Sequence, residues 1–308
     1  MIKRALISVW DKEGVVELAK FLNENDIEII STGGTKKTLE DNDIKVTSIS
    51  EITGMGSVMD GRVKTLDPRI FGSILADRKN PSHLDDLERI GGEQIDIVVV
   101  NLYPFEDNAI KKQLSLKDSI EYIDIGGPSM LRAAAKNFQN VVPLCDSSLY
   151  QKFIESFSEN NGVIPMNDRA FFATKVFELT SDYENKIFSH FNKENSEGLP
   201  DRLSINLYKR NNLRYGENPH QKAGFYLKQN LSNDLWRQHQ GKDLSYNNYN
   251  DLESAFNIVN DFSELSCVII KHANPCGFGI GDSLIAAYER AVSADPVSYF
   301  GGIVGFNQ

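Results

Sequence analysis

The sequence is poor in cysteine and has no long apolar run. Its three cysteines, Cys145, Cys267 and Cys276, show no paired spacing among 308 residues, which excludes a disulfide framework and favours a reducing compartment. No apolar run approaches the roughly 20 residues that a membrane span requires. The N-terminus also lacks the apolar segment and cleavage site of a signal peptide. These absences predict a cytoplasmic protein with no membrane partner.

Positive charge is also in short supply. The chain has 33 lysines and arginines against 43 aspartates and glutamates, a formal net charge of -10. Nucleic-acid binding depends on clustered lysine and arginine, so this composition argues against a nucleic-acid partner. Any anionic ligand must therefore be held by local donors. The length of 308 residues suits two globular domains.

Apolar runs alternate with helical periodicity through the first 190 residues. This order is typical of an α/β protein with a parallel sheet covered on both faces. Strands are expected at 5–9, 27–31, 45–49, 95–102 and 141–146. Helices are expected at 13–25, 36–42, 116–123, 147–159 and 166 to about 193. The run at 95–102 is apolar at nearly every position, which favours the centre of the sheet.

A polar stretch at 192–201, with Gly198 and Pro200, is typical of a linker. Beyond it the composition turns to asparagine and tyrosine. A helix, a strand and a second helix are expected in turn near 251–262, 267–272 and 283–294. The predicted domains are 1–198 and 199–308.

Polar segments follow the predicted strands of the first domain. In an open α/β sheet, ligands bind outside the carboxyl ends of the strands, so these segments are expected to converge. The stretch STGGT at 31–35 offers hydroxyls and glycine N–H groups before a helix, which suits a phosphate, although an ordinary Gly-Gly turn explains it equally well. Arg62 and Lys64 lie two apart and could grip one anion. Taken alone, a solvated basic loop is the commoner explanation of that pair.

The segment DIGGPSMLRAAAKN begins with Asp124 and contains Lys136. Pro128 suits the first turn of a helix, because a helix leaves the N–H groups there without partners. Lys136 lies about 12 Å further along that helix at 1.5 Å per residue. The alanines before it keep the helix slim, so the lysine could be carried toward the loops, although a surface lysine is the commoner explanation.

Together these motifs resemble a known enzyme family. SVWDKEG, STGGT, GRVKTL, VVNLYPF and IDIGGPSMLRAAAKN resemble, in order, the first domain of the bifunctional purine biosynthesis (PurH) family. LRYGENPHQ, GKDLSYNN, KHANPCG and DPVSYFGGIVGFN resemble its transformylase domain. The resemblance implies a methylglyoxal-synthase-like parallel sheet domain followed by an incomplete cytidine-deaminase-like α/β transformylase domain.

The resemblance implies that the first domain is an IMP cyclohydrolase, which closes FAICAR to IMP with loss of water and without metal or cofactor. Lys64 would stabilise the developing oxyanion and Tyr103 would hydrogen-bond the reacting groups. Asp124 and Lys136 would form a proton-handling pair. The family's ribotide-binding positions correspond to Trp10, Asp11, Lys12, Thr32, Gly33, Gly34, Thr35, Arg62, Val63, Thr65, Val100, Asn101, Ile125 and Gly126.

Two residues depart from the family pattern. The family usually has histidine at the positions of Asp67 and Phe71. A carboxylate near Lys64 could weaken its pull on an anion, but we expect activity to survive because the motifs with implied roles are intact. The alternative is a ribotide-binding module that has lost catalysis. A methylglyoxal-synthase-like phosphate lyase is less favoured, since it should need a histidine near STGGT, where this chain has none.

For the second domain, the resemblance implies formyl transfer to AICAR with formyl-tetrahydrofolate as cosubstrate. His272 matches the position of the base and Lys271 that of the oxyanion stabiliser. Ribotide-binding and folate-side positions correspond to Arg214, Tyr215, Phe300 and Gly301. Zinc deaminases of this fold bind metal through H-x-E and P-C-x-x-C, and both patterns are absent here, so no metal is expected.

The sequence ends at Gln308, inside what resembles the transformylase domain. We therefore expect this 308-residue species to have cyclohydrolase activity and little or no transformylase activity. Because the family is homodimeric, a homodimer is expected by analogy. Its small-molecule partners would be the purine ribotides FAICAR, IMP and AICAR.

Overall fold

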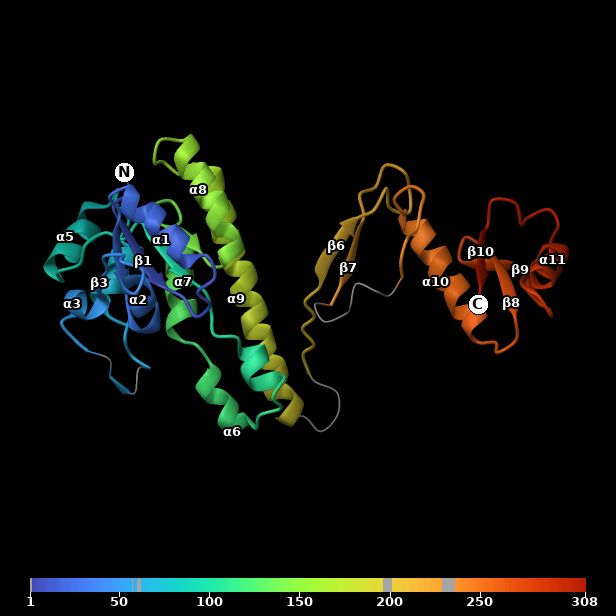
Figure 1. Cartoon of the computed structure of the whole chain (residues 1–308), viewed down its shortest axis with the longest axis horizontal. Coiled ribbons are helices and arrows are strands. Elements are labelled where there is room, and N and C mark those ends of the chain that lie inside the picture. Colours follow the sequence, from blue (N-terminus) through green and yellow to red (C-terminus); the bar gives the residue numbers. More distant parts are fainter. Residues whose placement is uncertain (1, 57, 60–61, 196–200, 229–235) are drawn as a thin grey trace. The chain divides into compact units, whose positions relative to one another are not determined.

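The computed structural model divides the chain into two compact units, Met1–Ser204 and Ile205–Gln308. It describes every residue except 1, 57, 60–61, 196–200 and 229–235 (Figure 1). The domain boundary predicted between residues 198 and 199 lies outside the described residues, so it stays a prediction. No helix in the described part of the chain is both long and apolar enough to cross a membrane.

The first unit is built on a five-stranded parallel sheet with the order β3-β2-β1-β4-β5. The strands are β1 (Arg4–Ser8), β2 (Glu28–Ser31), β3 (Thr47–Ser48), β4 (Ile97–Val100) and β5 (Val142–Leu144). The predicted α/β class is thereby confirmed. Every residue of β4 is buried, as expected of a β-branched strand covered on both faces. The central strand is β1, however, and β4 is its neighbour.

Helices cover this sheet. α1 packs against β2, α2 and α8, whereas α7 packs against β4 and β5 and is itself contacted by α4 and α9. Figure 1 shows the long α9 running beside α7. The α-helices are α1 (Val15–Glu24), α2 (Gly33–Glu40), α3 (Ile49–Thr53), α4 (Pro68–Leu75), α5 (Pro81–Arg89), α6 (Leu116–Ser119), α7 (Gly126–Lys136), α8 (Tyr150–Glu159) and α9 (Met166–Asn195). Shorter turns are the π-helix η2 (Glu106–Ile110) and the 3-10 helices η3 (Ile120–Tyr122) and η4 (Ser147–Leu149).

Two differences from the predicted elements have local causes. Helices α4 and α5 were not expected, yet each begins with a proline at its first position, after Asp67 and Asn80 respectively. Both capping side chains accept a backbone N–H of the first turn, which stabilises a helix start. The linker was predicted to begin at residue 192, but α9 continues to Asn195, so the predicted start is three residues or more too early.

The second unit has antiparallel sheets. β6 (Tyr208–Asn212) pairs with β7 (Gly224–Leu227), and a three-stranded sheet has the order β10-β8-β9. Its elements are β8 (Ser266–Lys271), β9 (Asn274–Ile280), β10 (Ile303–Phe306), α10 (Tyr246–Asn260) and α11 (Leu284–Ala294). A Cβ atom on Gly277 would lie 2.0 Å from the carbonyl oxygen of Ala291. Glycine is therefore required where β9 crosses α11.

Candidate active site

Three polar segments meet at one edge of the parallel sheet, because β1, β2 and β4 end there. The side chain of Asn101, one residue after β4, binds the segment after β1. Its Oδ1 accepts the backbone N–H groups of Trp10 and Asp11, and its amide donates to the carbonyl of Asp11 at 2.9 Å. One side chain thus fixes the loop after β1 to the end of β4.

Thr35 ties the same loop to α2. Its buried hydroxyl donates to the carbonyl of Val9 at 2.9 Å and accepts the Val9 N–H at 3.1 Å. Lys12 also turns back onto this loop, where its amine donates to the carbonyls of Val9 and Trp10. Burial lowers the pKa of Lys12, while the charge of Asp11 opposes the shift. The loop after β1 is therefore rigidly held.

Lys64 lies beside the start of α2. A Cβ atom on Gly33 would be 3.8 Å from Lys64 Nζ, and Gly33 has a φ of 55° that favours glycine. A Cβ on Gly34 would meet nothing within 4 Å, so the first turn of α2 is open. Unpaired N–H groups at a helix start and a nearby ammonium are both suited to an anion. Thr32, in extended backbone, precedes that turn.

The segment 62–65 also packs against the start of α7. A Cβ on Gly126 would lie 3.1 Å from the hydroxyl of the buried Thr65. Arg62 forms an ion pair of 2.5 Å with Glu121, and both side chains are exposed. Val63 pairs with Val58 through backbone hydrogen bonds. These contacts place Lys64 and the Asp124 segment on neighbouring loops.

Asp124 is the half-buried carboxylate of the site. Its Oδ1 accepts the N–H of Gly127 at 2.9 Å. Burial raises the pKa of Asp124, and hydrogen bonds from the backbone N–H groups of Gly127, Tyr103 and Gly126 partly oppose that shift. A carboxyl group with a raised pKa is better able to accept and return a proton near neutral pH. Ile125, between Asp124 and α7, is exposed.

Two aromatic rings form an exposed wall next to this carboxylate. The ring centroids of Trp10 and Tyr103 are 4.8 Å apart, and the rings are 52% and 44% exposed. Burial, together with the negative charge of Asp124, raises the pKa of Tyr103, so its phenol stays protonated and can donate. Rings of this kind can pack against a flat heteroaromatic group. Val100, by contrast, is buried as the last residue of β4.

The expected pair of Asp124 and Lys136 does not form within one chain. Asp124 precedes α7 and Lys136 is its last residue. A helix of 11 residues rises about 16 Å, so the two charged groups lie at opposite ends. The expectation that the helix returns the amine to the carboxylate is wrong, because a straight helix carries its C-terminus away from its start.

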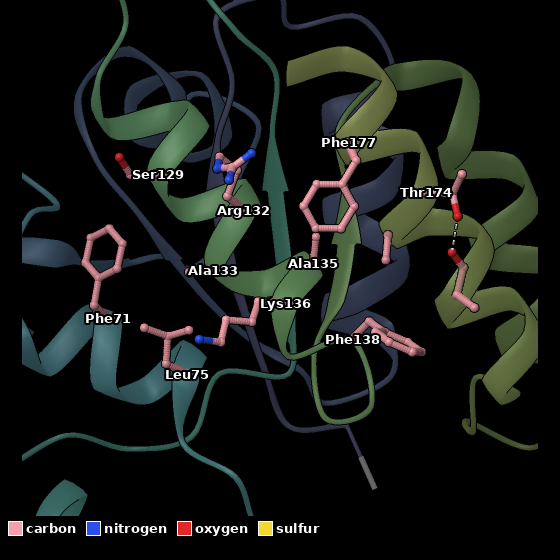
Figure 2. A pocket seen from close by; sticks show the side chains of 12 residues that line it. Phe71, Leu75, Ser129, Arg132, Ala133, Ala135, Lys136, Phe138, Thr174 and Phe177 are labelled. Carbon is pink, nitrogen blue, oxygen red and sulfur yellow. Dashed lines mark hydrogen bonds between the residues drawn. The ribbon is translucent and has the colours of Figure 1, made fainter. Parts of the chain in front are cut away.

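Lys136 instead lines a separate groove between α4, α7 and α9. Figure 2 shows its side chain extending toward Leu75. The groove has a volume of about 910 Å³ and also contains Phe71, one of the two departures from the family pattern. Arg132 lies in the same groove, 5.9 Å from the ring centre of Phe177. Phe71 therefore lines this groove and not the site at the carboxyl ends of β1, β2 and β4 (the strand-end site).

Asp67, the other departure, is held by Arg69. Both oxygens of the Asp67 carboxylate accept from the Arg69 guanidinium at 2.9 Å, and Oδ1 also accepts its backbone N–H. These bonds lower the pKa of Asp67. Its negative charge is therefore compensated locally, so we no longer expect Asp67 to weaken the pull of Lys64 on an anion.

The predicted residues of the second unit lie on exposed segments. His272 and the following Ala273 form the two-residue turn between β8 and β9, with φ angles of 52° and 60°. Asp251 of α10 accepts the N–H of Ala273 at 2.7 Å. Lys271 ends β8, and its charge contributes to the lowered pKa of Asp295, behind the hydrogen bonds that Asp295 accepts from nearby residues.

Arg214 and Tyr215 stack on each other, with the guanidinium 4.8 Å from the ring centre. The backbone of Tyr215 accepts the N–H of Tyr246, the first residue of α10. Gly301 has a φ of 77°, and the neighbouring Phe300 is 81% exposed. Among the described residues, no hydrogen bond or ion pair joins Arg214 or Gly301 to His272.

Tyr183 was not predicted to take part in the site. Its hydroxyl accepts the backbone N–H of Asp124 at 2.7 Å. The sequence could have indicated this role, because Tyr183 falls on the buried face of the predicted helix. A buried phenol hydroxyl needs a hydrogen-bond partner. Within the described ranges, no cluster of three or more His, Cys, Asp or Glu side chains could hold a metal ion.

Comparisons with known proteins agree with this architecture. A model of the MGS-like domain matches residues 14–129, and a model of the AICARFT/IMPCHase bienzyme family matches residues 134–308. The gap between the two matches, residues 130–133, lies within α7, whereas the compact units divide after Ser204. The two family matches therefore do not meet at the boundary between the two packed units.

Curated relatives and a solved structure point to the same family. A bifunctional purine biosynthesis protein PurH from Clostridium botulinum (strain Hall) is 49% identical over 312 residues, and one from Bacillus cereus (strain B4264) is 48% identical over 311. Each match covers 100% of this chain and 61% of the relative, so the chain spans about three fifths of their length. The crystal structure of ForH aligns with a TM-score of 0.56 and 30% identity, covering 63% of this chain and 100% of that one. The chain therefore belongs to the AICARFT/IMPCHase bienzyme family.

Proposed function

We propose that the first unit is an IMP cyclohydrolase. In the proposed reaction the carboxamide nitrogen of FAICAR attacks the formyl carbon of the same molecule and forms a new C–N bond. The formyl oxygen then leaves as water, taking one hydrogen from the carboxamide nitrogen and one from the formamide nitrogen. The two reacting groups are already tethered, so the site has to orient them and move protons. The proposal includes no metal and no cofactor.

The observation that carries this proposal is a half-buried carboxylate, Asp124, that lies close to the Tyr103 phenol, on a segment that packs against the loop of Lys64. Asp124, with its pKa raised by burial, would accept the carboxamide proton. Lys64 lies beside Gly33 at the start of α2, where it could stabilise the oxyanion that develops on the formyl oxygen. Tyr103, which remains protonated, would donate to the reacting groups.

The same edge offers a way to hold the rest of the substrate. The open first turn of α2 suits the ribotide phosphate, since the N–H groups at a helix start attract an anion. The exposed Trp10 and Tyr103 rings would pack against the imidazole ring. Lys136 is left out of this proposal, because it lies at the far end of α7 and lines the groove.

The test is a spectroscopic assay of IMP formation from FAICAR with the purified 308-residue chain. We expect turnover by the wild-type chain and a loss of roughly 100-fold in kcat for Asp124→Asn. The matched control is Asp85→Asn, an exposed acidic residue of α5. Binding of IMP without any turnover by the wild-type chain would instead establish the ribotide-binding module as its function.

Family membership also supports a proposal for the second unit. His272 would act as the base and Lys271 as the oxyanion stabiliser in formyl transfer from formyl-tetrahydrofolate to AICAR. Both lie at the exposed end of the β8–β9 hairpin, where water competes with a substrate for them. We therefore expect formyl transfer by this chain to be slower than cyclisation.

By analogy with the family, we also propose that the chain forms a homodimer. Sedimentation of the same preparation tests this proposal.

A further inference from the structure

Tyr183 of α9 reaches the backbone of Asp124 from behind the site. The N–H of Asp124 donates to Tyr183 Oη at 2.7 Å, and the same hydroxyl lies 3.5 Å from the carbonyl of Tyr122. Tyr183 is only 6% exposed. Burial, with the Asp124 charge as a smaller contribution, raises the pKa of Tyr183 to about 12, so this phenol stays neutral at any working pH.

The ring of Tyr183 contacts the other reactive segment as well. It packs edge-on against Phe105, with centroids 6.4 Å apart, inside a small apolar cluster that includes Ala109. Phe105 lies two residues after Tyr103 and donates its N–H to the Tyr103 carbonyl at 2.8 Å. One residue of α9 therefore touches both segments that carry the proposed donor and base.

Packing alone does not explain a tyrosine at this position. A phenylalanine would fill the same apolar space against Phe105, whereas the hydroxyl adds a partner for the N–H of Asp124. A buried N–H without a partner is costly, so removing the hydroxyl would favour a shift of this backbone. The direction of the Asp124 carboxylate depends on that backbone, because its side chain has only two rotatable bonds.

We propose that Tyr183 is a positioning residue for the reaction at the strand-end site, fixing the Asp124 carboxylate through its backbone N–H. This inference rests on the proposed cyclohydrolase function. Tyr183 lies behind the loop, so it acts through Asp124 and does not touch the substrate. α9 reinforces this hold through Lys186, whose amine lies 2.8 Å from a carboxylate oxygen of Glu106, next to Phe105.

The test compares Tyr183→Phe with Thr180→Val in the 308-residue chain. Thr180 is a buried residue of the same helix, and its hydroxyl bonds weakly to Phe177 and not to the site. For Tyr183→Phe we expect kcat for IMP formation to fall about tenfold while KM changes less than about twofold, since the base is displaced and the binding groups are not. Thr180→Val should keep wild-type kcat. Equal kcat values for Tyr183→Phe and wild type, or an equal loss in both variants, would overturn the inference.

Amide hydrogen exchange separates this inference from the proposed function. In the wild-type chain the Asp124 amide should exchange slowly, and Tyr183→Phe should accelerate it at least about tenfold without changing the amides of β1 and β4. An unprotected wild-type Asp124 amide would contradict the positioning role even if cyclisation is observed. A wild-type chain that forms no IMP would overturn the cyclohydrolase proposal, and with it the catalytic meaning of a protected amide.

Discussion

The candidate residues of the first unit lie at the ends of buried parallel strands, whereas those of the second unit lie on an exposed hairpin turn. Asn101, Thr35 and Tyr183 hold the first set in place through hydrogen bonds to backbone groups. In the second unit, His272 and Ala273 adopt left-handed backbone, and Asp251 provides one bond to that turn. The positions of the first set are therefore fixed by several hydrogen bonds from buried or half-buried side chains. The positions of the second set are fixed by a strained turn with few contacts.

This difference has a consequence for the chemistry of the two sites. Burial raises the pKa of Asp124, which prepares a carboxyl group for proton transfer near neutral pH. The exposed hairpin turn leaves His272 largely in contact with water, where charges interact weakly. We therefore expect substitutions in the first unit to act mainly on turnover, and those in the hairpin mainly on local stability.

The largest effect is expected for Lys64→Ala. If Lys64 stabilises the oxyanion, its loss should reduce kcat for IMP formation by roughly 100-fold to 1000-fold, with a modest change in KM. The measurement is steady-state kinetics with FAICAR. Lys37→Ala, which removes an exposed lysine from the last turn of α2, is the control and should retain wild-type rates. Unchanged turnover in Lys64→Ala would remove its proposed role.

A smaller loss is expected for Gly127→Ala. The new Cβ would lie 2.4 Å from Asp124 Oδ2 and 3.0 Å from Leu102, so the carboxylate must move. A displacement of about 1 Å at a reacting group can cost about 100-fold in rate, and we expect a loss of that order in kcat. Gly56→Ala serves as the control, because its Cβ would meet no atom within 4 Å. Similar rates for both variants would mean that the position of Asp124 does not limit turnover.

The third prediction concerns stability and pH. Burial raises the pKa of Asp124 above its ordinary value of 3.8, so the folded chain binds more protons than the unfolded chain above that pH. This carboxyl group therefore lowers stability as pH rises from about 4 through its raised pKa, and Asp124→Asn should remove that loss. The nearby phenols of Tyr103 and Tyr183 remain protonated over this range.

The measurement is the difference in Tm between Asp124→Asn and wild type at several pH values. We expect the difference to move in favour of the variant as pH rises from about 4 through the raised pKa of Asp124. Asp85→Asn should show no such trend, since Asp85 lies on the exposed surface of α5. A pH-independent difference for Asp124→Asn would show that burial does not disfavour its ionised form.

The two units also differ in how much of their structure the sequence could predict. Parallel strands such as β4 are continuous β-branched runs, so their positions and the convergence of the segments after them followed from pattern alone. The strands of the second unit were harder, because β9 is interrupted by Pro275, Gly277 and Gly279, which a sequence pattern associates with turns. Those glycines are explained only by the close approach of α11.

Roles that depend on distance along a helix or between helices could not be predicted as well. The length of α7 places Lys136 far from Asp124, although both belong to one motif. Tyr183 reaches Asp124 from 59 residues away, through the packing of α9 against the site segments. Sequence spacing indicates which residues share a helix face, but it does not indicate which distant loop that face will meet.

The smallest effect is expected for Ala273→Gly, which tests the strained turn directly. Left-handed backbone costs a residue with a Cβ roughly 1 kcal/mol, and glycine avoids this cost but loses more freedom on folding. With Ala273 at a φ of 60°, the two terms should leave a gain of less than about 1 kcal/mol in local stability. Hydrogen exchange of the β8 and β9 amides measures that gain separately from the first unit. Ala294→Gly, at the end of α11, is the matched control and should destabilise, because Ala294 lies in right-handed helix. If Ala273→Gly accelerates exchange as the control does, the turn is not strained, and the hairpin is held as firmly as the strand-end loops.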